Sequence, residues 1–203
     1  MRPGRIRQPK THKASAIVLA LTCCAWLSGC SLGYEYDPRL AAAYNPEVVV
    51  VRFDPATPMV FGYYNVDLGR EWESDDFRWF LAQAVAAELQ HSGVHVVLAK
   101  DGADIPDHIK PNLRYLISGE ITHFDRVDRD PFGNLWIGMD ADVFVYDIAS
   151  DRVVLLEPFS QTGTTCATMN SHCHAAALGQ AAAAIGVEAV DNMLTRIPDL
   201  KSP

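Results

Sequence analysis

Residues 135–146, LWIGMDADVFVY, alternate between two kinds of side chain over their whole length. A period of two is typical of a β-strand that has one face on a core. The apolar set consists of Leu135, Ile137, Met139, Ala141, Val143 and Val145, and the opposite set of Trp136, Gly138, Asp140, Asp142, Phe144 and Tyr146. Residues 113–124, LRYLISGEITHF, repeat this pattern. The alternation predicts a sheet that helices cover on one face only.

The flanking segments supply the other elements of this sheet. Residues 47–53, EVVVVRF, form a β-branched run between two prolines, and their unbroken apolarity predicts a central strand. Residues 94–99 predict a further strand. A hairpin turn over residues 148–152 leads into a last strand that ends near Gln161.

Two helices complete the pattern. The first begins at Ser74, a preferred N-cap residue, and ends at Gly93, and the second spans residues 175–197. Their apolar stripes are Phe77, Leu81, Val85 and Leu89, and Leu178, Ala182, Ile185, Ala189 and Met193. The order β-α-β-β-β-β-α predicts an α+β fold, a two-layer sandwich in which a largely antiparallel five-stranded sheet carries two helices on one face.

The first thirty residues have the organisation of an export signal. A basic stretch ending at Lys13 is followed by an uncharged run of 13 residues, Ala14 to Trp26. This run is shorter than the roughly 20 apolar residues that a permanent transmembrane helix needs, so the sequence favours a signal over a permanent span. Leu27-Ser28-Gly29-Cys30 resembles the lipobox of bacterial lipoproteins, which implies cleavage between Gly29 and Cys30 and acylation of Cys30. The alternative is an ordinary thiol after a conventional cleavage site near Ala25.

This resemblance also implies a location and a domain plan. In the lipoprotein pattern, a residue other than Asp after the modified cysteine, here Ser31, favours the outer membrane over the inner one. We therefore expect a protein anchored to the outer membrane by lipid and facing the periplasm. The expected parts are a signal peptide (1–29), the lipidated cysteine and a linker (30–47), an α+β domain (48–197) and a tail (198–203). The linker could instead be ordered against the domain.

Charge argues against one class of partner. Removal of residues 1–29, which hold five basic residues and no acidic one, shifts the formal net charge from −8 to −13. Such a surface repels phosphate backbones, so we expect no nucleic acid partner.

The segment Cys166 to His174 is the richest local cluster of reactive side chains. In an oxidising compartment, Cys166 and Cys173 are expected to form a disulfide. The alternative is a periplasmic metal-binding lipoprotein that holds copper(I) or zinc with Cys166, Met169, His172, Cys173 and His174. The spacing favours the disulfide, because three adjacent residues converge poorly on one ion.

The sequence holds no GxSxG, Walker loop, dinucleotide fingerprint or HExxH motif, and we expect neither catalysis nor a cofactor. Asp125, Asp128 and Asp130 are expected to lie in a solvated loop rather than to bind calcium. Asp140 and Asp142 share a strand face and could imitate an acid and base pair, but no His, Lys or nucleophile is in visible register with them.

Aromatic residues provide the candidate contact surface. Trp136, Phe144 and Tyr146 project from the face predicted to be wet, and exposed rings of this kind mark sites of association. The alternative is that the insertion at residues 54–73 folds across this face and buries the rings.

The order of elements over residues 48–197, together with the lipobox, is similar to that of small bacterial envelope lipoproteins. The similar group includes the YajG-type lipoproteins and the auxiliary lipoproteins of ABC-type lipid transport, whose domain resembles the amino-terminal domain of the Tol translocation protein. The resemblance implies a non-enzymatic binding or assembly component of an envelope complex, related to transport or to the cell wall.

Overall fold

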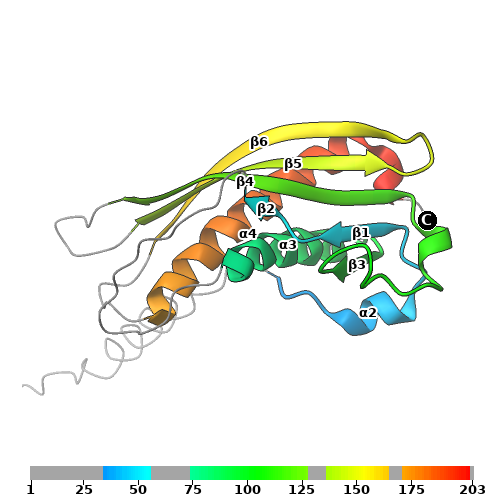
Figure 1. Ribbon diagram of the computed structural model, residues 1–203, viewed down its shortest axis with the longest axis horizontal. Helices are drawn as coiled ribbons and strands as arrows, with labels where there is room; N and C mark the ends of the chain where they lie inside the picture. Colours follow the sequence, from blue (N-terminus) through cyan, green and yellow to red (C-terminus); the bar gives the residue numbers. More distant parts are fainter. Residues whose placement is uncertain (1–33, 56–73, 128–135, 165–170, 202–203) are drawn as a thin grey trace, which may run out of the picture. The chain divides into compact units, whose positions relative to one another are not determined.

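The computed structural model describes residues 34–55, 74–127, 136–164 and 171–201. Figure 1 shows a mixed sheet lying on two long helices. Among the described residues the strand order is β3-β1-β4-β5-β6, and a short strand, β2 (Asp54–Pro55), pairs with β4. The predicted α+β two-layer fold is confirmed.

The strands fall into a parallel and an antiparallel half. In the parallel half, β1 (Val48–Val51) lies between β3 (Val96–Ala99) and β4 (Tyr115–Val127), as predicted for a central strand. In the antiparallel half, β4 pairs with β5 (Trp136–Asp147), and β5 pairs with β6 (Arg152–Thr164). The sheet is mixed because it contains both kinds of pairing, and the long strands β4, β5 and β6 make the antiparallel half the larger one.

The helices bury the described members of the stripes predicted from their sequences, and the Phe77 side chain lies outside the described residues. Leu81, Val85 and Leu89 of α3 (Ser74–His91) are fully buried, and the chain leaves this helix through Gly93, whose φ is +84°. Only glycine adopts such a φ without strain. The five stripe residues of α4 (Ser171–Arg196) are at most 1% exposed. None of the described helices is long and apolar enough to cross a membrane.

One main core lies between the sheet and these helices, as the alternation of β4 and β5 predicts. Ile117 and Ile121 of β4 and Met139 and Val143 of β5 all belong to it. Leu200, in the short 3-10 helix Pro198–Lys201, is buried in the same core. The packed unit therefore includes these residues as well.

A second, smaller core covers the other face of the parallel half. Ile105 and Ile109, in the loop that follows β3, pack with Val49, Val97 and Ala99. The run of valines in β1 is apolar on both faces, and a strand of this kind requires cover on both.

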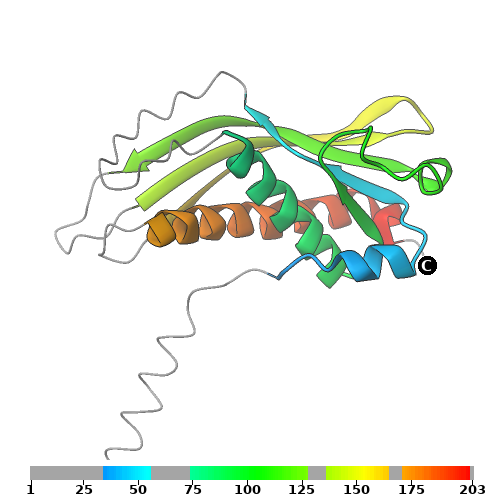
Figure 2. The ribbon, with the colours of Figure 1, turned by 60° about the horizontal axis from the view of Figure 1, so that its bottom comes forward.

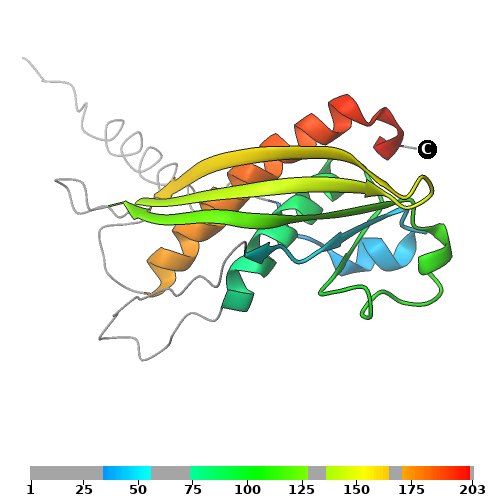
Figure 3. The ribbon, with the colours of Figure 1, turned by 45° about the horizontal axis from the view of Figure 1, so that its top comes forward.

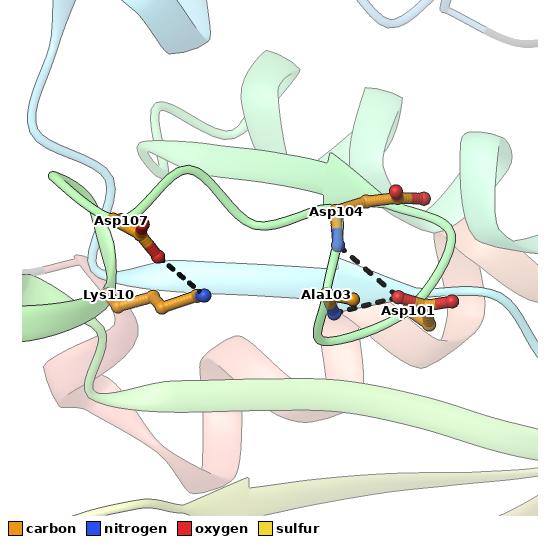
Figure 4. Close-up of polar contacts among 5 residues, drawn as sticks. All are labelled: Asp101, Ala103, Asp104, Asp107 and Lys110. Atoms are coloured by element: carbon orange, nitrogen blue, oxygen red, sulfur yellow. Dashed lines mark hydrogen bonds and ion pairs between the residues drawn. The ribbon is translucent and has the colours of Figure 1, made fainter.

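Local hydrogen bonds fold the loop that makes this cover (Figure 4). The Asp101 carboxylate accepts bonds from the backbone N–H groups of Ala103 (2.7 Å) and Asp104 (3.2 Å). Lys110 Nζ lies 2.8 Å from Asp107 Oδ1. These contacts fix the course of the loop through polar groups alone. The side chains of Ile105 and Ile109 remain available to pack on the strands.

Residues Tyr34–Tyr44, which we call the strap, are packed against α3 and β3, the second of the two alternatives for the linker. Asp37 caps the helix α2 (Pro38–Ala43) by accepting a bond from Arg39 N–H (2.9 Å), and Pro38 begins the helix. Asp37 N–H also donates to Gln90 Oε1 (2.9 Å), and Gln90 Nε2 donates to the Asp37 carbonyl (3.0 Å). Figure 2 shows α2 on the same side of the sheet as the helices.

Candidate functional site

The face of β4, β5 and β6 turned away from the helices is the candidate site, and we call it the open face. Figure 3 shows these three strands in front, with α4 behind them. The cross-strand register brings four rows of side chains to this face: Leu116–Tyr146–Val153, Ser118–Phe144–Leu156, Glu120–Asp142–Pro158 and His123–Asp140–Ser160. The rows nearest the β5–β6 hairpin are mainly apolar, and the next two carry the carboxylates.

The two rows nearest the hairpin form an apolar patch, which consists of Phe144, Tyr146, Val153 and Leu156. Leu156 is 61% exposed and Val153 is 52% exposed, whereas the two rings are half-buried. An isolated exposed leucine is ordinary, but neighbouring exposed apolar groups on one face mark a site of contact.

The hairpin beside the patch is held in place by its own polar groups. The Asp147 carboxylate accepts bonds from the N–H groups of Ala149 (2.9 Å) and Ser150 (3.3 Å). Asp151 has a φ of +55°, a conformation that aspartate tolerates in turns. Its carboxylate accepts a hydrogen bond from the Tyr146 hydroxyl, which raises the pKa of Tyr146. The ring of Tyr146 is thereby tied to the turn.

Carboxylates occupy the adjoining part of the open face. Glu120 and Asp142 lie directly opposite each other on β4 and β5, and Asp140 lies two residues from Asp142 on the same strand. Like charges placed opposite each other in a sheet are destabilising. This acidic group and the apolar patch share one surface, which suits a partner that is both basic and apolar.

A bulge corrects one prediction about this face. His123 and Ser160 lie on either side of Asp140, although no histidine or nucleophile was expected in register with it. The register between β4 and β5 shifts between Ile121 and His123, so His123 reaches the open face, which strict alternation from Ile121 would not allow.

The order within this row matters for chemistry. Asp140 stands between His123 and Ser160, and neighbouring strands are about 4.8 Å apart, so the backbones of the other two lie about 10 Å apart. A catalytic triad needs histidine in the middle, within hydrogen-bond reach of the nucleophile. In the part of the chain that the structure describes, no group of three or more His, Cys, Asp or Glu side chains could hold a metal ion.

The other predicted site residues are placed only in part. Phe144 and Tyr146 lie on the predicted face, and the backbone of Trp136 pairs with Val127 and Thr164 at the far end of β5. The Trp136 side chain, Gly29, Cys30 and Cys166 lie outside the described residues. Cys173 is in α4, but its side chain and those of His172 and His174 also lie outside them, as do Met169 and the insertion at residues 56–73.

Two features of the surface were not predicted from the sequence. Val153 and Leu156 belong to a predicted strand, but a bulge between Val145 and Tyr146 breaks the alternation of β6, so no face could be assigned to them. The strap helix had a readable signal, because Asp37 followed by Pro38 is a common helix start.

Comparison with known proteins gives weak likenesses in structure alone. No family model matches the sequence, and no curated protein matches it. A Xanthomonas campestris protein of the DUF330 family is 16% identical, with 82% of this chain and 93% of that chain covered and a TM-score of 0.49.

Two further solved structures are similar to the same degree. The PelC dodecamer of Paraburkholderia phytofirmans is 17% identical, with 72% and 88% covered and a TM-score of 0.44. A lipoprotein of Neisseria meningitidis is 14% identical, with 72% and 99% covered and a TM-score of 0.41. Likenesses of this degree assign neither a family nor a function to the chain.

Proposed function

We propose that this chain is a bacterial lipoprotein, anchored through acylated Cys30 to the outer membrane, whose periplasmic domain binds a component of an envelope complex. The anchor rests on the basic and apolar order of the first 26 residues and on Leu27-Ser28-Gly29-Cys30. Each buried acyl methylene contributes about 0.8 kcal/mol, so two or three chains hold a protein on a membrane.

The observation that carries the binding role is the apolar patch on the open face. Leu156 and Val153 are more than half exposed beside two half-buried rings, and the carboxylates of Glu120 and Asp142 lie next to them. Full burial of a leucine contributes about 1.5 to 3 kcal/mol, so a partner that covers this patch gains affinity from it. The adjoining negative charge favours a partner with Lys or Arg beside its apolar residues.

We propose binding rather than catalysis. The separation of His123 from Ser160 by Asp140 supports this choice, because a nucleophile must lie within hydrogen-bond reach of its base. The partner complex is related to transport or to the cell wall, as the resemblance to envelope lipoproteins implies.

Two measurements test the anchor and the docking face separately. For the anchor, intact mass should show acyl chains on the native protein, and Cys30→Ala should move it from the membrane to the soluble fraction. For the face, a photo-reactive amino acid is placed at Leu156 in the full-length protein in cells, with Val187, which is 40% exposed on α4, as the matched control.

The two positions should then differ. We expect one discrete cross-linked product from position 156 and none from position 187. Replacement of Phe144 by Ser should reduce that product, because loss of about 1.4 kcal/mol lowers affinity about tenfold. Equal products from both positions, or none from position 156, would refute docking at the open face.

A further inference from the structure

The strap is part of the domain rather than a loose tether. Besides the paired bonds between Asp37 and Gln90, the Leu98 N–H donates to the Tyr36 hydroxyl (3.2 Å). The Tyr34 ring stacks on His91 with the ring centres 3.4 Å apart, and Tyr44 stacks on His95 at 4.2 Å. These contacts are distributed from Tyr34 to Tyr44, so the whole strap is fixed to the domain.

The chain between the anchor and this fixed point is short. Ser31, Leu32 and Gly33 are the only residues between Cys30 and Tyr34. Four steps of at most about 3.6 Å reach about 14 Å when fully extended. The headgroup layer on each side of a bilayer is about 5 to 7 Å thick. An acylated Cys30 therefore keeps Tyr34, the first residue of the strap, within about two to three headgroup thicknesses of the hydrocarbon.

The exposed side of the strap suits that position. Tyr34 (54% exposed), Leu40 (45%) and Tyr44 (50%) are large apolar side chains within eleven residues, and exposed Arg39 lies beside Leu40. The buried Ala41 marks the side of α2 that faces the domain. Tyrosine is enriched at membrane interfaces, and arginine binds lipid phosphates.

We propose that the outer surface of the strap, formed by Tyr34, Arg39, Leu40 and Tyr44, contacts the phospholipid headgroup layer that holds the acyl chains. This inference rests on the proposed acylation of Cys30. It also sets the direction of the open face, because α2 lies on the helix side of the sheet and β4–β6 present their open face to the opposite side. The docking face is then turned away from the membrane.

Hydroxyl-radical footprinting of the full-length mature protein tests this contact. The acylated protein is reconstituted in vesicles of phosphatidylethanolamine and phosphatidylglycerol and compared with the Cys30→Ser protein in solution. We expect the modification of Tyr34, Leu40 and Tyr44 to fall by about threefold or more in vesicles, as for groups held in the interface. Leu156, which lies on the open face, is the internal control and should be modified equally in both samples.

The outcomes separate this inference from the function on which it rests. A native protein without acyl chains refutes the proposed anchor and the inference together. An acylated protein whose strap is modified as strongly in vesicles as in solution refutes the inference alone. Equal protection of the strap and of Leu156 also refutes it, because the membrane would then cover no particular face.

Discussion

Replacement of Gly163 by Ala tests how closely α4 approaches β6. A Cβ atom at position 163 would lie 1.8 Å from the carbonyl oxygen of Ala177 and 3.1 Å from the backbone nitrogen of Ala181. Cβ atoms essentially never lie closer than 3.0 Å to such a neighbour, so α4 would have to move by more than about 1 Å. The obstacle is helix backbone and cannot rotate away. We expect a loss of about 3 kcal/mol, the upper end for overpacked cores.

The matched control is Gly179→Ala in the same helix. A Cβ atom there meets nothing within 4 Å, so the better helix propensity of alanine should stabilise the domain by about 0.5 to 1 kcal/mol. Urea unfolding of both variants, in a mature chain with Cys30→Ser, measures the two free energies. With a slope of about 2 kcal/mol per molar urea, the midpoint should fall by about 1.5 M for Gly163→Ala and rise slightly for Gly179→Ala.

The direction in which Gly163→Ala shifts the urea midpoint decides whether α4 packs closely on β6. Gly163 is not among the described residues with positive φ, so alanine there carries no backbone strain. Without a close helix, the substitution would therefore stabilise the strand by about 0.5 to 1 kcal/mol. A rise in the urea midpoint of Gly163→Ala would refute the packing of α4 on β6.

Three further predictions concern the core, an ion pair and pH. Ile185→Ala should cost about 2 to 5 kcal/mol in urea unfolding, whereas Val187→Ala, two residues away but 40% exposed, should cost under about 1 kcal/mol. Asp199→Asn removes the 2.8 Å ion pair with Arg114 at the surface and should change the unfolding free energy by less than about 1 kcal/mol. Burial raises the pKa of Tyr36 above 10.0. The contribution of the neutral Tyr36 hydroxyl to the unfolding free energy is therefore complete below about pH 10 and is lost as the pH rises through the pKa of the folded state. In the same assay, Tyr36→Phe should lose less stability at alkaline pH than the unchanged protein.

The elements whose sequence pattern repeats many times were predictable from the sequence. The alternation of Ile137, Met139 and Val143 in β5 and the spacing of Leu81 and Val85 in α3 each repeat often enough to fix a face. In both cases the pattern lies within one element, so it can be interpreted without knowing which distant segment packs against it. The two-layer fold follows from these local patterns.

Features that depend on one extra residue or on distant partners were not predictable. A bulge brings His123 to the open face, and another breaks the alternation that would have assigned Leu156 to a face. The cover that Ile105 and Ile109 give to β1 is a contact between segments about 55 residues apart. Turn-rich sequence gives no period from which to infer such a contact.

Part of the sheet stays uncovered among the described residues. Unpaired strand edges and apolar faces invite unwanted association, and natural proteins cover them. Here the strap supplies Tyr36 to the N–H of Leu98 at the β3 edge, and the loop after β3 covers the second face of the parallel half. Among the described residues, cover of both kinds stops short of Val153 and Leu156, which stay more than half exposed. The same chain covers comparable surfaces nearby, and the exposure of this patch is the observation on which the proposed partner rests.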